Sequence, residues 1–282
     1  SGTFSETWLA GYSLTRVFVI FLVILAMSAT INIFSSHLLA VINNISVWWH
    51  VAGATCVIAI LIVVPKQHAS LSDVFAKTVN NTGMFNGATS GVGWLIFVLP
   101  ISAILTQYTI TGYDASAHIS EETKGAADGA AKGIWRAIVY SAIGGWILLL
   151  TFLFAVNDSD AVSAGGGAVA VIFSQAMSSP WVGVVLLIST AGQLFCLTAI
   201  QTSSSRMLFA FSRDRAVPGH QLWSKVSKNK IPANGVIVTA ALAAVITLPA
   251  LVEVDVNGAP VPVAFFAVAS IGVVGLYPVS YT

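Results

Sequence analysis

Long apolar runs separated by short polar segments form the main pattern of this chain. Seven of these runs are about 20 residues long or longer, the length that an α-helix needs to cross the hydrocarbon of a bilayer. They cover residues 12–34, 45–64, 94–113, 134–156, 182–211, 236–254 and 261–281. The fifth run is too long for one crossing, so we expect it to tilt or protrude. The pattern predicts an all-α integral membrane protein whose seven transmembrane spans form a single domain over residues 1–282.

The composition agrees with this interpretation. Hydrophobic residues make up 56% of the chain and charged residues only 8%, whereas a soluble domain carries about 25% charged residues. The net charge of +1 gives no reason to expect a nucleic acid partner. Cys56 and Cys196 both lie in apolar runs, so we interpret them as small buried side chains and expect neither a disulfide nor a metal site. No cofactor is expected.

Lys and Arg are distributed unevenly among the loops, which predicts the orientation of the spans. Cytoplasmic loops carry an excess of these residues. The loops after the third and fifth runs are basic, while residues 157–180 form an acidic loop without Lys or Arg. We therefore expect the two basic loops on the cytoplasmic side and the N-terminus outside. Residues 65–93 fit less well, because this external loop holds Lys66 and Lys77. Apolar positions near helical spacing over residues 71–79 predict a short surface helix there.

The third run ends on Gly112 and Asp114, where a membrane-embedded helix should remain apolar. We predict that the helix is broken over residues 110–115. An unpaired backbone group in hydrocarbon costs several kcal/mol, so an unwound stretch persists only inside protein or along a cavity. Such half-broken helices commonly form the substrate site of secondary transporters. The alternative is that Gly112 only permits close helix packing.

The depth of this break depends on where the hydrocarbon begins. If it begins at Trp94, Gly112 lies about 27 Å further along the helix, near the inner surface. If Pro100 is near the outer boundary, the break lies closer to the middle of the bilayer. We favour the second arrangement, with residues 115–123 forming a second half-helix beside a water-filled inner vestibule.

Polar side chains gather near the break and on the fifth run. His118 lies one helical turn after Asp114, so the two form either a proton-sensing pair or a pair of solvated loop residues. At 100° per residue, one face of the fifth run collects Thr190, Thr198, Gln201 and Ser205. Hydrogen bonding between helices is the alternative explanation of this face, at about 0.6 kcal/mol per contact.

Several charged and aromatic residues receive interpretations from their position alone. Arg206 either extends to the cytoplasmic interface or pairs with Glu121 or Glu122 as part of an inner gate. Trp48, Trp49 and His50 open the second run and resemble an interfacial aromatic belt. His37 and His220 fall in predicted loops. The sequence contains no His-Glu-x-x-His or Gly-x-Ser-x-Gly motif, so we expect a protein that is not an enzyme.

Two segments carry a family resemblance. Residues 111–123, TGYDASAHISEET, resemble the broken sixth helix of permeases of the amino acid–polyamine–organocation superfamily. The likeness is greatest to the branch that transports amino acids, gamma-aminobutyrate and choline. Residues 203–218, SSSRMLFAFSRDRAVP, are similar to the end of the eighth helix and the following loop of that superfamily.

The resemblance implies a twelve-helix transporter with inverted repeats, of which this chain holds roughly helices four to ten. The first three and last two helices have no counterpart here, so the chain is interpreted as a piece of a longer protein. On this interpretation residues 110–114 contact substrate, Tyr113 forms an aromatic gate or a side wall of the pocket, and Thr202 and Ser203 lie near the region that holds an ion in sodium-coupled relatives. Together with the polar residues described above, the candidate substrate contacts are Ile110, Thr111, Gly112, Tyr113, Asp114, Thr198, Gln201 and Thr202. The candidate coupling or gating residues are Asp114, His118, Glu121, Glu122, Ser203 and Arg206.

The expected function is secondary active transport of an amino acid, gamma-aminobutyrate or a choline-like amine across the plasma membrane by alternating access. The branch resemblance favours proton coupling, but no residue pattern decides between H⁺ and Na⁺. The expected partners are the small-molecule substrate and the lipid bilayer. The alternative is a membrane sensor or channel-like protein that binds the same ligand without coupled transport.

Overall fold

A computed structural model describes residues 14–34, 36–80, 82–120, 123–164, 168–228, 231–252, 254–256, 259–261 and 268. Four helices within these ranges are long and apolar enough to cross a membrane. They are α2 (Leu14–Phe34), α3 (Ser36–Val63), α7 (Ala126–Phe154) and α10 (Ser179–Arg213). They correspond to the first, second, fourth and fifth apolar runs. The predicted all-α membrane architecture is therefore confirmed.

The third apolar run is divided among several short helical segments. It begins with a π-helical turn, η2 (Trp94–Val98), which continues into α5 (Leu99–Gln107). A 3₁₀ turn, η3 (Tyr108–Ile110), follows, and four residues separate it from α6 (Ala115–His118). The helix predicted over residues 94–113 is therefore interrupted before it reaches α6, as the prediction of a break at 110–115 required.

The sixth run forms a shorter helix than predicted. The helix α12 (Ala233–Thr247) passes into a 3₁₀ turn, η5 (Leu248–Leu251), so the predicted end at Val254 is wrong. Pro249 near the start of η5 lacks a backbone N–H donor and cannot continue the α-helical pattern. A small antiparallel hairpin of β1 (Val254–Val256) and β2 (Ala259–Val261) follows. Nearly all of the seventh run, residues 261–281, lies outside the described residues.

Short helices occupy the connections at one end of the bundle. The predicted surface helix at 71–79 is present as the shorter α4 (Leu71–Phe75). Its N-terminus is capped by Ser70 and Asp73, and the hydrogen bond from the Ser70 hydroxyl holds the pKa of the Asp73 carboxyl below its usual range. Residues 157–180 are not the simple loop that we predicted, because α8 (Ser159–Ala164) and α9 (Ala168–Ala176) form there. The turn η1 (Met84–Gly87) follows α4 in the chain.

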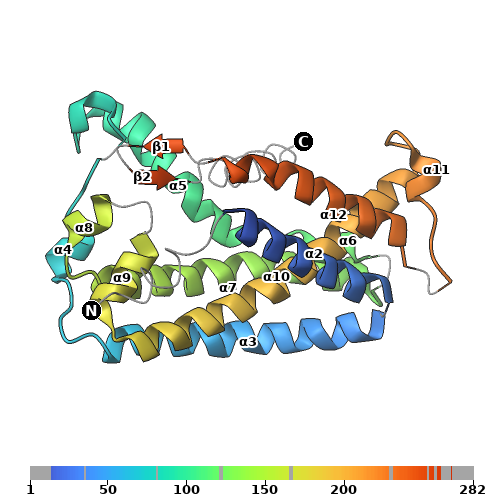
Figure 1. Cartoon of the computed structure of the whole chain (residues 1–282), viewed down its shortest axis with the longest axis horizontal. Helices are drawn as coiled ribbons and strands as arrows, with labels where there is room; N and C mark the ends of the chain where they lie inside the picture. Colours follow the sequence, from blue (N-terminus) through green and yellow to red (C-terminus); the bar gives the residue numbers. More distant parts are fainter. Residues whose placement is uncertain are drawn as a thin grey trace.

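The basic and acidic connections lie at opposite ends of the bundle (Figure 1). The start of α7 and the short helix α11 (His220–Trp223), which belong to the basic connections, lie toward the right of the view. The junction of α2 with α3, which has no Lys or Arg, lies at the same end. The helices α4, α8 and α9 lie at the left. This arrangement matches the alternation of basic and acidic loops along the sequence.

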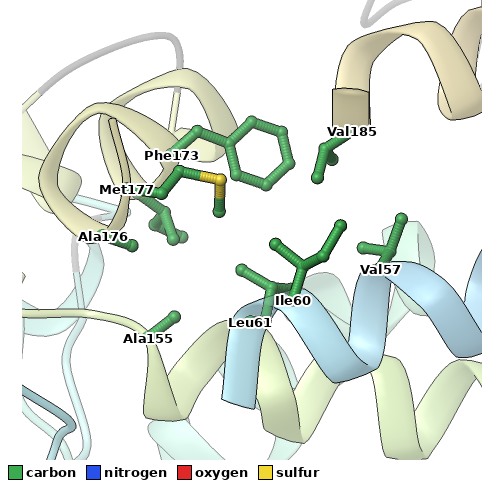
Figure 2. Close-up of a cluster of buried hydrophobic side chains, with 9 residues drawn as sticks. Val57, Ile60, Leu61, Ala155, Phe173, Ala176, Met177 and Val185 are labelled. Carbon is green, nitrogen blue, oxygen red and sulfur yellow. The ribbon is translucent and has the colours of Figure 1, made fainter. Parts of the chain in front are cut away.

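A cluster of buried apolar side chains packs α9 against the ends of three long helices, α3, α7 and α10 (Figure 2). Phe173 on α9 and Met177 just after it lie toward the last turns of α3. The rings of Phe173 and Phe152 on α7 pack with centroids 5.5 Å apart. The cluster consists of Val57, Ile60, Leu61, Ala155, Ile172, Phe173, Ala176, Met177 and Val185. The connection between α7 and α10 is therefore packed against the bundle.

The second long helix begins earlier than predicted. Because α3 starts at Ser36, Trp48, Trp49 and His50 lie in its middle and do not open it, and His37 lies in its first turn. The prediction that His37 occupies a loop is therefore wrong. His220 is likewise the first residue of the short helix α11. The predicted span began after the polar residues Asn43 and Asn44, because they interrupt the apolar pattern. A helix of 28 residues can extend beyond the bilayer, so these polar residues are compatible with its first turns.

The helix α10 is the central element of the described fold. It packs against α2, α3 and α12, and also contacts the short helix α6. The approach of α12 is close, since a Cβ atom at Gly235 would lie 3.1 Å from the Ser205 carbonyl oxygen. The break in the third run therefore ends beside the same helix that carries the polar face of the fifth run.

Candidate functional site

The backbone between η3 and α6 leaves the helical conformation at Thr111 and Gly112. Thr111 is extended, with φ −62° and ψ 136°, and Gly112 has a φ of +88°. A positive φ of this kind is strained for residues with a Cβ atom, so glycine is the natural residue here. Two tight turns flank the glycine, with Thr111 N–H donating to the Tyr108 carbonyl and Ala115 N–H donating to the Gly112 carbonyl, both at 3.1 Å.

The broken segment is held against α7 on both sides of the interruption. A Cβ atom at Gly145 would lie 2.5 Å from Thr109 Cγ2, and one at Gly133 would lie 2.9 Å from Ser116 Oγ. The Ser116 hydroxyl also donates a 3.1 Å hydrogen bond to the Ala130 carbonyl. Two glycines on α7 thus allow close approach before and after the break. This packing holds the segment in place without help from regular helical hydrogen bonds.

Asp114 and His118 form a pair across the first turn of α6. The Oδ2 atom of Asp114 lies 3.2 Å from the Nε2 atom of His118, and the two side chains are 34% and 25% exposed. Both groups are thus partly accessible and neither is fully buried. The two side chains are therefore in contact, while their role as a proton-sensing pair or as solvated loop residues stays a prediction. Ile110, Thr111 and Tyr113 are half-buried beside them.

The predicted polar face of α10 is buried against α2. Thr198, Gln201, Thr202 and Ser205 are all buried, whereas Thr190 is exposed and does not belong to this face. The Ser28 hydroxyl donates to Gln201 Oε1 at 2.6 Å, joining α2 to α10. Interhelical hydrogen bonding, the alternative explanation of this face, is therefore present.

Asn32 on α2 is the centre of this network, and it is completely buried. Its side-chain amide donates to the carbonyls of Ser28, at 3.0 Å, and Thr198, at 3.3 Å. Its Oδ1 atom accepts a 2.6 Å hydrogen bond from the Thr202 hydroxyl. Ser28 and Asn32 were not among the residues predicted from the sequence. Their four-residue spacing within the first apolar run places them on one helix face and was the available signal.

One donor in the network is unsatisfied. The Nε2 atom of Gln201 is buried and has no hydrogen-bond partner within the described part of the chain. A buried donor without a partner costs about 1–3 kcal/mol, so native proteins seldom retain one without a reason. Gln201 is therefore a polar group with unused capacity to bind an acceptor.

The remaining coupling and gating candidates lie near the basic end of α10. Ser203 is half-buried and Arg206 is buried, with the Arg206 guanidinium 3.5 Å from the Thr202 carbonyl oxygen. This burial argues against extension of Arg206 into the interface. Glu121 and Glu122 lie outside the described residues, so the proposed ion pair with Arg206 stays a prediction.

The two groups of predicted substrate contacts are separate in this structure. Within the described residues, the side-chain hydrogen bonds of Thr198, Gln201 and Thr202 run along α10 or to α2, and none reaches residues 110–114. The contact of α6 with α10 places the two groups on neighbouring elements. Their assignment as substrate contacts stays a prediction.

Replacing Asn32 with Ala is expected to destabilise the helix bundle by about 1–3 kcal/mol. The variant loses three hydrogen bonds, each worth about 0.6 kcal/mol and at most about 1.7 kcal/mol in a membrane protein. The free energy of unfolding in detergent micelles measures the effect. Thr30→Ala is the matched control, since Thr30 is exposed on the same helix and donates only to the Ala26 carbonyl. Equal stability of both variants would contradict a role for the network.

Comparison with known proteins supports a transporter. The family described as "Amino acid permease" matches residues 4–279. The chain is 36% identical over 266 residues to "Amino-acid permease BAT1 homolog" of Oryza sativa subsp. japonica, and 32% identical over 264 residues to "Amino-acid permease BAT1" of Arabidopsis thaliana. Each of these alignments covers 90% of this chain and 48% of the relative.

A more distant relative is named as a polyamine transporter. The chain is 23% identical over 289 residues to "Polyamine transporter TPO5" of Saccharomyces cerevisiae, an alignment that covers 100% of the chain and 45% of the relative. The chain thus spans about half the length of these curated relatives. No solved structure matches it.

Proposed function

This chain belongs to the amino acid permease family, and on that premise we propose that it forms part of a secondary active transporter for an amino acid or a related small amine. The full protein works by alternating access in the plasma membrane. The names of the relatives, amino-acid permeases and a polyamine transporter, support a substrate that carries an ammonium group. Gamma-aminobutyrate and choline-like amines remain within this proposal.

The interrupted helix at Gly112 carries the proposal. Between η3 and α6 the backbone of this membrane protein lacks regular α-helical hydrogen bonds. Backbone groups released in this way persist at membrane depth only where protein or water satisfies them. In secondary transporters such groups line the substrate site between the moving parts. Ile110, Thr111, Gly112 and Tyr113 are the residues that contact substrate on this proposal.

Asp114 provides the charge that an ammonium-bearing substrate requires. Its carboxylate is partly accessible at the start of α6 and adjoins His118. A proton held by Asp114 or His118 while the substrate is bound couples uptake to a proton gradient, which is the form of coupling that we propose. Na⁺ coupling near Ser203 is the alternative.

The polar face of α10 forms a second wall of the proposed site. Thr198, Gln201 and Thr202 are buried among helices that are long enough to cross a membrane. The Nε2 atom of Gln201 is a hydrogen-bond donor without an acceptor among the described residues. A substrate carboxylate is an acceptor that fits this donor. Arg206, Glu121 and Glu122 are proposed to close the inner end of the pathway.

An accumulation assay tests transport directly. The full-length protein is reconstituted into vesicles with an imposed proton gradient and offered labelled amino acids, gamma-aminobutyrate, choline and polyamines. We expect at least one labelled compound to accumulate above its external concentration, and an uncoupler to abolish this accumulation. Binding without accumulation for the whole panel would instead indicate a sensor, and equilibration without accumulation would indicate a channel-like protein.

A further inference from the structure

The connection between α10 and α12 carries a concentration of positive charge that the proposed transport mechanism does not use. Residues 213–230 contain five Lys or Arg residues and one acidic residue, Asp214. That carboxylate is already paired, since its Oδ1 atom lies 3.2 Å from the Nε atom of Arg213. Three exposed cations form no ion pair within the described part of the chain: Arg215, Lys225 and Lys228. Their charge favours an anionic partner at this connection.

The length of α12 places this connection at the membrane surface. The 15 residues of α12 and the four of η5 together extend about 30 Å, which only just equals the thickness of the hydrocarbon. The start of α12 therefore lies at the interface. The Asn234 amide donates to the Leu222 carbonyl at 2.9 Å, and the Ser227 N–H donates to the Ile231 carbonyl at 2.8 Å. Since α11 also contacts both α10 and α12 (Figure 1), the connection is held at the level of the first turn of α12.

The backbone at the end of α10 holds Arg215 in an unfavourable conformation. The Ala216 N–H donates to the Phe211 carbonyl at 2.9 Å and the Arg215 N–H donates to the Ser212 carbonyl at 3.1 Å, which are the two hydrogen bonds of a Schellman motif. The residue after the cap in this motif is usually glycine, because its φ is positive. Arg215 occupies that position with a φ of +60°, which is strained for a residue with a Cβ atom. Strain of this kind gathers at functional sites, which indicates a role for the guanidinium group.

Exposed apolar side chains accompany these cations. Leu222 and Val226 are 47% and 49% exposed, and Lys225 lies between them in the chain. The Trp223 indole donates a 3.1 Å hydrogen bond to the Pro218 carbonyl, which fixes the fold of the connection around α11. Exposed aliphatic side chains beside Lys and Trp are typical of segments that lie in a membrane interface, where cations meet phosphate groups and apolar side chains meet acyl chains. A soluble anion would make no use of Leu222 and Val226, so a lipid fits this surface better.

We propose that the connection between α10 and α12 binds the headgroups of anionic phospholipids through Arg215, Lys225 and Lys228. Clusters of basic residues at the cytoplasmic end of a transmembrane helix are suited to such headgroups. The Arg215 guanidinium binds a phosphate with paired hydrogen bonds, and the two ammonium groups act as point charges. Leu222 and Val226 contact the acyl chains below. This inference does not depend on transport, because lipid binding is measured without substrate.

Photocrosslinking with two lipids of equal chain length tests this site. The full-length protein is placed in nanodiscs that contain photoactivatable phosphatidylglycerol or phosphatidylcholine in both leaflets, and labelled peptides are identified by mass spectrometry. We expect phosphatidylglycerol to label residues 213–228 at least about tenfold more strongly. A basic residue near an anionic surface contributes about fivefold in affinity, so Lys225→Gln combined with Lys228→Gln should lower this ratio at least about fivefold.

The matched control removes two lysines from the opposite end of the bundle. Lys66 and Lys77 are also exposed, but they belong to the end that carries the acidic connection. Lys66→Gln combined with Lys77→Gln should leave the labelling ratio of residues 213–228 unchanged. Equal labelling by the two lipids, or an equal loss in both double variants, would overturn the proposal.

Arg215→Gly separates lipid binding from stability. Glycine adopts the positive φ of this position without strain, so the melting temperature of the variant should not fall. The preference for phosphatidylglycerol should nevertheless fall at least about threefold, because the guanidinium group is lost. An unchanged preference would contradict the role of Arg215.

A last measurement uses the unaltered protein and distinguishes a lipid from a soluble anion. High concentrations of NaCl should weaken the preference for phosphatidylglycerol, since exposed charges are screened over about 3 Å in 1 M salt. An excess of inorganic phosphate at matched ionic strength should have no further effect, because phosphate has no acyl chain. Displacement of the lipid by phosphate would indicate a site for a soluble anion, and a preference that salt does not change would exclude binding through charge; either result would overturn the proposal.

Discussion

Replacing Asp114 with Ala is expected to lower the rate of substrate uptake by the full-length protein at least about 30-fold. The proposed role of this carboxylate is to bind the substrate ammonium group beside His118. Truncating one partner of a buried hydrogen-bonded charge pair costs about 2–5 kcal/mol; Asp114 is partly exposed, so we take the lower end, and 2 kcal/mol corresponds to about 30-fold. Initial uptake in reconstituted vesicles at matched protein insertion measures the effect.

Asp128→Ala is the matched control for this variant. Asp128 contacts Lys132 four residues later, as Asp114 contacts His118, but its pair lies on the exposed start of α7, with the side chains 77% and 57% exposed. A surface pair of this kind contributes about 0–1 kcal/mol, so uptake should change less than about fivefold. Equal loss in both variants, or normal uptake by Asp114→Ala, would remove Asp114 from the site.

Replacing Gly112 with Ala is expected to reduce uptake about 5-fold to 30-fold. Apart from its chain neighbours, no atom of the described residues lies within 4 Å of the Cβ position, so the added methyl group meets no obstacle among them. The cost comes from the φ of +88°, since a left-handed conformation disfavours a residue with a Cβ atom by about 1–2 kcal/mol. If the break is the functional conformation, this strain lowers the fraction of protein that is competent to bind.

Gly144→Ala separates this backbone effect from the effect of an added methyl group. Gly144 lies inside α7, and no other described element has an atom within 4 Å of its Cβ position. Alanine is favoured over glycine in a helix by about 1 kcal/mol, so uptake and insertion should be unchanged. If Gly112→Ala transports as well as Gly144→Ala, the positive φ at Gly112 is not needed for function.

The broken helix shows how far local sequence can predict a site. Gly112 followed by Asp114 in an apolar run identified the interruption and its bounds to within a residue or two, because both residues oppose a lipid-embedded helix. The pairing of Asp114 with His118 also followed from their spacing. The sequence did not indicate that Thr109 and Ser116 pack against Gly145 and Gly133 of α7, because such contacts depend on the approach of a distant helix.

The polar face of α10 was predicted in part. Helical periodicity correctly placed Thr198, Gln201 and Ser205 on one face, but it also included Thr190, which the structure leaves exposed. Periodicity gives the direction of a side chain around its own helix and says nothing of how far the neighbouring helix extends. Only the packing of α2 beside α10 identified Asn32 as the residue that joins them.

The apolar runs and their loop charges alone determined that this protein is a multi-pass helical membrane protein with an interrupted third span. The reason is that the thickness of a bilayer and the cost of unpaired backbone groups constrain each segment separately. The family also followed from short local motifs. Tertiary structure decided the partners of each span: the fold of α9 across the bundle end, the Asn32 network, and His50 facing Cys196 instead of the interface. These features depend on contacts between different segments, in the Asn32 network and at His50 between residues more than 100 positions apart, which no periodicity within one segment encodes.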